Sequence, residues 1–244
     1  MDISAKDDTA NYGDAPVPEH AEKTAEDVWL PRDCSEIDQS QSGKSGLYEV
    51  QPAGGNPSFQ VYCDMDTDGG NWTVFQRRID GTQNFNRSWI DYKTGFGDLT
   101  SEYWLGNDKI YQMTSQTSQR NYELRIDLTD EEGNTKFAKY ESFRIDNETM
   151  KYRLHIGSYS GNAGNSLLTH NGMVFSTWDN DNDMLVWHHC AGMFHSGWWF
   201  KSCHQANLNG LYNSQGIIWY KLTGYLTPLK ASEMKMRPTS LERK

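Results

Sequence analysis

The sequence predicts an α+β fold that is built on a mainly antiparallel sheet and carries a few short helices. The clearest sign is the segment 122–128, where apolar and charged residues alternate, because a period of two places one set on each face of a strand. The 244 residues include 21 Gly and 9 Trp, a composition typical of turns and short strands rather than of long helices. The third sign is the segment 157–216, which has little periodicity; a stretch of this length is usually functional when it is ordered.

The first expected elements are strands at 46–50 and 59–63, joined by a turn across 52–57. The sequence Asp-Thr-Asp-Gly-Gly at 66–70 predicts a hairpin turn, because glycine adopts a positive φ without steric cost. The apolar and β-branched residues at 72–76 form the next expected strand. These residues are therefore expected to form consecutive strands joined by tight turns.

A short helix is expected over 103–113, with Ser101 as its N-cap. After the alternating segment, a turn at 130–135 predicts that the polypeptide returns as a strand at 137–145. Alternation resumes at 152–156, which predicts a further strand. Strands of this kind with one apolar face form antiparallel sheets that are covered on one side.

The irregular segment 157–216 is rich in Gly, Asn, Asp, Trp and His, and five of the 9 Trp lie in it or just past it. The aromatic run at 198–200 and the aromatic residues around it are interleaved with Asn, His and Gly. The run is therefore either core or the wall of a ligand pocket, in which rings stack on apolar C–H faces. The last expected strands lie at 216–220 and 232–236.

The net charge of −10 is distributed unevenly along the sequence. Nine of the 33 acidic and three of the 23 basic residues lie in 1–33, which gives this part −6 and leaves −4 for the rest. Residues 1–32 contain three prolines and no regular period, so we expect a flexible acidic arm, in which no signal peptide is visible. The net negative charge argues against nucleic-acid binding, which needs a basic face, and no apolar run approaches the roughly 18 residues of a membrane helix, so membrane insertion is not expected.

The cysteines indicate disulfides rather than metal ligands, because the sequence has no CxxC pair. Four cysteines allow three connectivities, and the sequence alone does not choose among them. Together with candidate N-glycosylation sequons, the cysteines favour an extracellular, secreted protein. The cysteines are Cys34, Cys63, Cys190 and Cys203, and the sequons begin at Asn71, Asn86 and Asn147.

The run Asp179-Asn-Asp181-Asn-Asp183 is the strongest chemical signal in the sequence. Oxygen-bearing side chains at alternate positions are typical of calcium loops, because Ca²⁺ takes about six to eight oxygen ligands. The EF-hand continuation is missing, since Met184 stands at its glycine position and Cys190 at its bidentate glutamate. A calcium site here would complete its shell with backbone carbonyls and water; the alternative is a solvated turn rich in Asx residues.

No pattern in the sequence indicates catalysis. The histidines around Cys190 lack the paired spacing of a zinc site, and the HExxH and GxSxG motifs are absent. The tripeptide Gly43-Lys44-Ser45 ends like a phosphate-binding loop, but Asp38 replaces the first glycine of that motif. We therefore expect that the protein is not an enzyme.

Several stretches of the sequence share the order and the residues of one known family. They are Asp33-Cys34-Ser-Glu-Ile, Ser45-Gly-Leu-Tyr-Glu-Val, Val61–Arg78, Gly95-Phe-Gly, Glu102–Asp108, Phe175–Asp183, Gly197–His204, Asn207-Leu-Asn-Gly210 and Glu233–Pro238. On these residues the protein resembles the fibrinogen-like (fibrinogen C-terminal) domain, the module of ficolins, tachylectins, tenascins and angiopoietins. The resemblance covers about 33–238.

The resemblance implies a single domain of three parts. An N-terminal subdomain is expected at about 33–78, and a central subdomain at 79–156, completed by the C-terminal strand near 232–237. Its sheet is expected to be mixed but mainly antiparallel. An irregular subdomain at 157–231 would bind calcium and ligand, and residues 239–244 would be a tail.

The resemblance also implies the bonds and ligands of the binding subdomain. Ca²⁺ is expected on two carboxylates and two backbone carbonyls, next to a pocket that holds an acetyl group in lectin-like members. The peptide Ser202-Cys203, before the second cysteine of that subdomain, is expected to be cis, so that the next amides face the acetyl oxygen. Carried onto this sequence, these features give the disulfides Cys34–Cys63 and Cys190–Cys203, the calcium ligands Asp181, Asp183, Leu185 and Trp187, and the pocket residues Phe194, Cys203, His204 and Tyr212.

Two functions follow from the resemblance. The first is an extracellular calcium-dependent lectin, of an innate-defence type, that binds acetylated glycans or other acetylated surface groups. The second is a tenascin-like or angiopoietin-like ligand that binds a cell-surface or matrix protein through the same subdomain. The Asp/Asn loop and His204 favour the first, whereas a short loop at 212–219 favours the second. Either could act as a homo-oligomer.

Overall fold

A computed structural model describes residue 1 and residues 30–37, 43–52, 57–115, 120–212 and 216–239 of the protein. Nearly all of the predicted acidic arm at 1–32 and of the tail at 239–244 lies outside these residues. The helices are α1 (Trp89–Thr94), α2 (Asn107–Thr114), α3 (Cys190–Phe194) and α4 (Tyr220–Thr223), with single 3₁₀ turns η1 (Cys34–Glu36), η2 (Thr67–Gly69), η3 (Glu148–Met150) and η4 (Leu168–His170).

Ten strands form one sheet, and all of their pairings in the described residues are antiparallel. Its main order is β1-β2-β3-β12-β6-β7-β8, with β5 on β3, β4 on β5 and β9 on β7. The strands are β1 (Gly46–Val50), β2 (Phe59–Asp64), β3 (Trp72–Arg78), β4 (Phe96–Gly97), β5 (Tyr103–Trp104), β6 (Tyr122–Thr129), β7 (Thr135–Ile145), β8 (Leu154–Ile156), β9 (Tyr159–Gly161) and β12 (Ala231–Pro238). A separate pair is formed by β10 (Ala206–Asn207) and β11 (Ile218–Trp219).

The alternating segment 122–128 forms β6, as predicted. Its apolar side chains are buried, and it pairs with β7 from Thr129↔Thr135 to Tyr122↔Phe143. The C-terminal strand β12 enters between β3 and β6, so the last strand completes the middle of the sheet. The predicted α+β fold with a mainly antiparallel sheet and short helices is confirmed, whereas the division into three subdomains stays a prediction.

The predicted helix over 103–113 is wrong in its first half. Tyr103 and Trp104 form β5, where both rings are buried and the Tyr103 hydroxyl donates to the carbonyl of Val74 at 2.9 Å. The helix begins only after Gly106, whose φ of 113° separates the strand from α2. Burial of two aromatic rings against β3 thus outweighs the local capping signal of Ser101.

Two other short helices depart from the predictions. The expected strand at 216–220 is extended only as far as Trp219, and Tyr220 begins α4. Helix α1 was not predicted at all. Its signal is the capping box of Ser88 and Asp91, in which the Ser88 hydroxyl accepts from the Asp91 amide and the Asp91 carboxylate accepts from the Ser88 amide.

The aromatic run at 198–200 is core and not the wall of a pocket. Trp198, Trp199 and Phe200 are fully buried, and the Trp199 ring packs edge-on against Phe175 with 5.3 Å between the centroids. The neighbouring Gly197 permits this packing, because a Cβ there would lie 2.5 Å from the ring of Tyr92. The irregular segment is therefore anchored by an aromatic core of its own.

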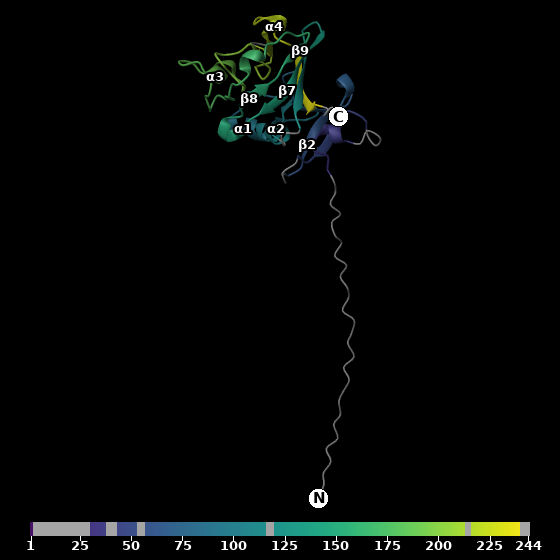
Figure 1. Cartoon of the computed structure of the whole chain (residues 1–244). Coiled ribbons are helices and arrows are strands. Elements are labelled where there is room, and N and C mark those ends of the chain that lie inside the picture. The colour runs from purple at the N-terminus through teal and green to yellow at the C-terminus, as the bar shows by residue number, and fades with distance from the viewer. Residues whose placement is uncertain (2–29, 38–42, 53–56, 116–119, 213–215, 240–244) are drawn as a thin grey trace.

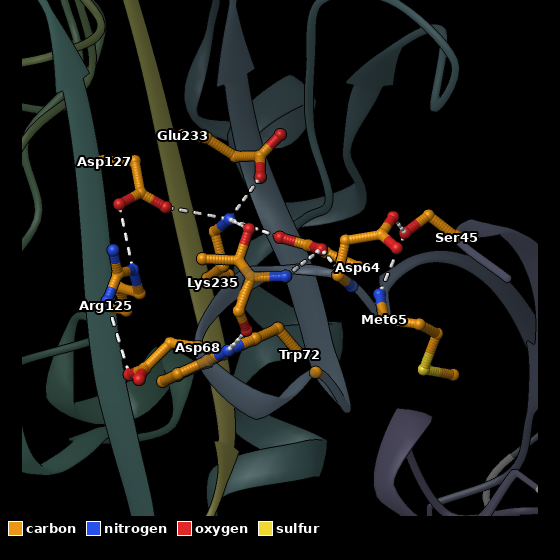
Figure 2. Close-up of polar contacts among 12 residues, drawn as sticks. Ser45, Asp64, Met65, Asp68, Trp72, Arg125, Asp127, Glu233 and Lys235 are labelled. Atoms are coloured by element: carbon orange, nitrogen blue, oxygen red, sulfur yellow. Dashed lines mark hydrogen bonds and ion pairs between the residues drawn. The ribbon is translucent and has the colours of Figure 1, made fainter. Parts of the chain in front are cut away.

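Lys235 of β12 ties three strands together on one face of the sheet (Figure 2). Its ammonium group lies 2.6 Å from the carboxylate of Asp64, 2.9 Å from that of Asp127 and 2.7 Å from that of Glu233, and its side chain is 3% exposed. Burial alone would raise the pKa of Asp64, but hydrogen bonds from Lys235 and Thr67 lower it to about 2. This network links the C-terminal strand β12 to β2 and β6 by ion pairs.

Figure 1 shows α3 and α4 together at one end of the domain, away from β2. Of the helices in the described residues, none is long and apolar enough to cross a membrane. The segments around α3 and α4 hold most of the side chains that the sequence assigned to binding, so the fold collects them at a single end of the molecule.

Candidate functional site

The predicted calcium residues Asp181 and Asp183 are neighbours in the loop that precedes α3. The Asp183 amide donates to the Asp181 carboxylate at 3.2 Å. The Asp183 carboxylate accepts from the amides of Leu185 and Cys190, both at 2.7 Å, and so holds the loop against the start of the helix. Two adjacent carboxylates repel one another, which a bound cation would relieve.

The pKa of Asp183 reflects the same repulsion between the two carboxylates. Burial raises it, the hydrogen bonds from the Leu185 and Cys190 amides lower it, and the negative charge of Asp181 raises it again, so the pKa lies above its usual range. Asp179, the first acid of the run, has a structural role. Its carboxylate accepts from the Trp89 amide at 2.9 Å and from the Thr177 hydroxyl at 2.7 Å, which ties the loop to α1.

The donors fit a calcium ion in part. Asp181 and Asp183 offer hard oxygen ligands, but the described residues contain no group of three or more acidic, His or Cys side chains able to hold a metal. The Leu185 carbonyl accepts from the His188 amide at 3.3 Å, which leaves its second lone pair. Trp187 is 89% exposed and its side chain has no oxygen, so the only calcium ligand it can offer is its backbone carbonyl. Backbone oxygens and water would have to complete the shell.

A hollow of about 540 Å³ lies next to α3, and Cys203, one partner of a disulfide, is part of its lining. The bond Cys190–Cys203 joins the start of α3 to the segment 201–204, whose Ser202-Cys203 peptide is cis, as expected. The other predicted disulfide, Cys34–Cys63, is also present. The hollow is lined by Met193, Phe194, Ser202, Cys203, His204, Ile218, Tyr225 and Leu226.

His204 lies among aromatic rings in this hollow. Its ring meets that of Phe194 edge-on with 4.4 Å between the centroids, and the ring of Tyr225 at 6.0 Å. The Nδ1 atom is buried and has no hydrogen-bond partner among the described residues. Burial lowers the pKa of His204 to about 4, so the imidazole is neutral at physiological pH and can donate or accept one hydrogen bond.

A second histidine, which the sequence did not single out, fixes the segment that follows. His170 is fully buried, and its Nδ1 donates to the Trp199 carbonyl at 2.7 Å. Its Nε2 accepts from the amides of Gln205 and Ala206 at 3.2 and 3.1 Å. Burial lowers the pKa of His170 to about 4, which keeps Nε2 free of a proton as this arrangement requires.

The structure does not bring Tyr212 to the hollow. Its hydroxyl donates to the carbonyls of Ile79 and Lys230, at 2.8 and 3.0 Å, and its ring packs over Gly81, where a Cβ would lie 2.6 Å away. The tyrosine at the hollow is Tyr225, whose hydroxyl donates to the His204 carbonyl at 3.0 Å. No periodic pattern marks Tyr225 or Leu226 in the sequence, because both lie in the irregular stretch between α4 and β12.

The three sequons differ in their surroundings. Asn147 is exposed and caps η3, where its carboxamide accepts from the Met150 amide at 3.1 Å. Asn71 has a φ of 66° beside the hairpin turn. The Oδ1 of Asn86 is buried and without a partner among the described residues. Whether these residues carry glycans stays a prediction.

Comparison with known proteins identifies relatives over nearly all of the described residues. The family profile of the C-terminal globular domain of fibrinogen β and γ matches residues 30–239. Fibrinogen-like protein A of Apostichopus parvimensis is 51% identical over 221 residues, which cover 86% of this chain and 77% of that protein. The fibrinogen-like globe domain of human ANGPTL2 has a TM-score of 0.81 and 41% identity, covering 86% of this chain and 100% of that one. Lamprey fibrin D-dimer, solved with the peptide ligand Gly-His-Arg-Pro-amide, has a TM-score of 0.79 and 36% identity, covering 88% and 76%.

Proposed function

Because the protein belongs to the fibrinogen C-terminal domain family, we propose that it is an extracellular recognition module. In this proposal it binds acetylated carbohydrates, or other acetylated surface groups, in a calcium-dependent manner. The observation that carries the proposal is the hollow beside α3, in which the buried Nδ1 of His204 lacks a partner among the described residues. A buried polar atom without a partner is costly, and a ligand that supplies one removes the cost.

The lining of the hollow suits an acetyl group. Phe194 and Tyr225 offer ring faces and edges to a methyl group, and a neutral His204 offers a hydrogen bond to an amide or ester. Among the described residues, no charged side chain lines the hollow, so a neutral ligand loses little solvation on entering. The two disulfides support an oxidising, extracellular location.

Calcium would be held by Asp181 and Asp183 with backbone oxygens near Leu185 and Trp187. Bound there, it supplies positive charge that offsets the repulsion between the two carboxylates. This loop is linked to the hollow in two ways: through the disulfide Cys190–Cys203 and through the Met184 amide, which donates to the Lys201 carbonyl at 2.9 Å. A well-ordered loop therefore supports the backbone that lines the hollow.

Chromatography on immobilised N-acetylglucosamine tests the proposal. The protein is applied with calcium, and elution is attempted separately with free N-acetylglucosamine and with a chelator. The proposal is supported if each of the two eluents, used separately, releases the protein from the resin. Retention that is indifferent to both, or no retention at all with calcium present, overturns it.

A protein-binding role is the second candidate. Val186 and Trp187 are 80% and 89% exposed at the tip of the loop, and exposed tryptophan is enriched at the energetic centres of protein interfaces. The likeness to the ANGPTL2 globe domain and to a fibrin that holds a peptide supports this role as well. Val186→Ser, at a position that is not a candidate calcium ligand, separates the two candidates, because it should leave retention on N-acetylglucosamine unchanged and weaken binding to a protein receptor.

A further inference from the structure

The hollow beside α3 is much larger than an acetyl group. Its volume of about 540 Å³ lies in the range of pockets that hold drug-sized ligands. An acetyl group has only three heavy atoms, and if each takes no more than the share of one water molecule, about 30 Å³, they fill less than a quarter of it. Most of the hollow is therefore available to other parts of a ligand.

The outer part of the hollow is apolar. Beyond His204 and Phe194, its edge is formed by Met193, Tyr225 and Leu226, of which Leu226 is 96% exposed and Tyr225 is 52% exposed. Three large apolar side chains at the rim of one hollow offer a ligand contact area that water otherwise covers. Tyr225 is held in place from both sides, since its ring packs on Tyr220 at 4.5 Å and its hydroxyl donates to the His204 carbonyl at 3.0 Å.

We propose that the site takes neutral ligands whose acyl group continues beyond acetyl as an apolar tail, which packs on Met193, Tyr225 and Leu226. The inference rests on the proposed function, because the carbonyl of the acyl group is placed at His204. The first carbon after the carbonyl lies between the rings of Phe194 and Tyr225, and the following carbons run outward along the rim. The described lining carries no charge that would favour a carboxylate or an ammonium group in place of the tail.

Lengthening the acyl tail should strengthen binding. Full burial of a methylene group raises affinity about fourfold, and at an open rim roughly half of each group is covered, which gives about twofold per methylene. From acetyl to hexanoyl, four methylenes are added, so the affinity should rise on the order of tenfold. A site built for acetyl alone would instead reject the longer tail, because a closed methyl pocket has no room for it.

Calorimetry of the protein with N-acetyl-, N-butanoyl- and N-hexanoyl-glucosamine, in the presence of calcium, tests the inference. We expect a steady rise in affinity with acyl length. In Leu226→Ser the rise in affinity from the acetyl to the hexanoyl compound should shrink at least threefold. Leu168→Ser removes a leucine of η4 that is 59% exposed and does not line the hollow; it is the control and should keep the full rise.

The outcomes separate this inference from the proposed function. If N-acetylglucosamine binds and the longer amides bind equally or more weakly, the inference is overturned and the proposed function stands. If the hexanoyl compound binds and the acetyl compound does not, the inference stands and the acetyl specificity fails. If none of the three binds, both are overturned. A rise that Leu226→Ser leaves intact also overturns the inference, because the acyl tail then packs elsewhere.

Discussion

The amide of Met184 donates a hydrogen bond to the carbonyl of Lys201 at 2.9 Å. Met184 directly follows the candidate calcium ligand Asp183, and Lys201 directly precedes the cis Ser202-Cys203 peptide at the hollow. With the disulfide Cys190–Cys203, this bond makes the loop and the hollow one connected unit. A change that loosens the loop should therefore weaken ligand binding without unfolding the sheet.

Asp181→Asn should lower calcium affinity at least tenfold, because it keeps the size of the side chain but removes one of two charged oxygen ligands. Retention on N-acetylglucosamine should fall with it at a fixed calcium concentration. Calorimetry with calcium measures the first effect and resin retention the second. Glu131→Gln, which removes an exposed carboxylate at the turn between β6 and β7, is the control and should change neither. Unchanged calcium affinity in Asp181→Asn would mean that the loop is not the calcium site.

His204→Ala should lower the affinity for the acetylated ligand at least tenfold and leave calcium affinity intact. The variant removes both the ring that packs on Phe194 and the nitrogen that the ligand would bind. His204→Phe separates the two effects, since it keeps a ring in the same place and should still lose most of the affinity. Equal loss of ligand and calcium binding in both variants would argue for a role in folding instead.

Tyr225→Phe and Tyr212→Phe each remove one hydroxyl but should change different properties: ligand affinity in the first variant and stability in the second. Tyr225→Phe deletes the bond to the His204 carbonyl, so ligand affinity should fall about fivefold. Tyr212→Phe deletes bonds to Ile79 and Lys230, so the free energy of unfolding should fall by about 1 kcal/mol with no change in ligand affinity. Calorimetry and urea denaturation give the two quantities. A loss of ligand affinity in Tyr212→Phe would contradict this assignment and show that Tyr212 contributes to ligand binding.

The pairing of Asp64 with Lys235 should make stability depend on pH at the acidic end. The pKa of Asp64 in the folded protein is about 2 and its ordinary value is 3.8, so the folded state favours the charged form. The stabilisation is therefore complete above about pH 4 and is lost as the pH falls towards 2. Asp64→Asn should lower the free energy of unfolding at pH 7 by about 2 kcal/mol, and the difference from the parent protein should shrink by pH 2. Urea denaturation at both pH values measures it; a difference that is the same at pH 7 and pH 2 would contradict the pairing.

Local patterns in the sequence predicted most of the sheet. The period of two in 122–128 identified β6, and the run Asp66–Gly70 identified the hairpin between β2 and β3, because both depend on residues close together in the sequence. The same reasoning failed at Tyr103–Trp104, where contact with β3 decides the conformation. It also missed α1, although the Ser88–Asp91 capping box was present in the sequence.

For the candidate site, the sequence identified the chemistry better than the location. The alternation of Asp181 and Asp183 and the ring of His204 were visible as residue types, and the structure connects their two segments through Cys190–Cys203. Tyr212 and Tyr225 could not be told apart in the same way. Both stand in stretches without a period, and only tertiary contacts, those of Tyr212 with Gly81, Ile79 and Lys230, hold it away from the hollow.

Residue types and their spacing were enough to identify the family resemblance, the antiparallel strands, the acidic loop and the set of four cysteines. These features depend on residue types and on spacings of a few positions, where local sterics and hydrogen bonding dominate. The tertiary structure alone decided that Trp198 and Trp199 are core, that Tyr225 and Leu226 edge the hollow, and that Lys235 joins three carboxylates. Each of these depends on contacts between segments far apart in the sequence, and burial, which no local pattern encodes, determines which side chain occupies which place.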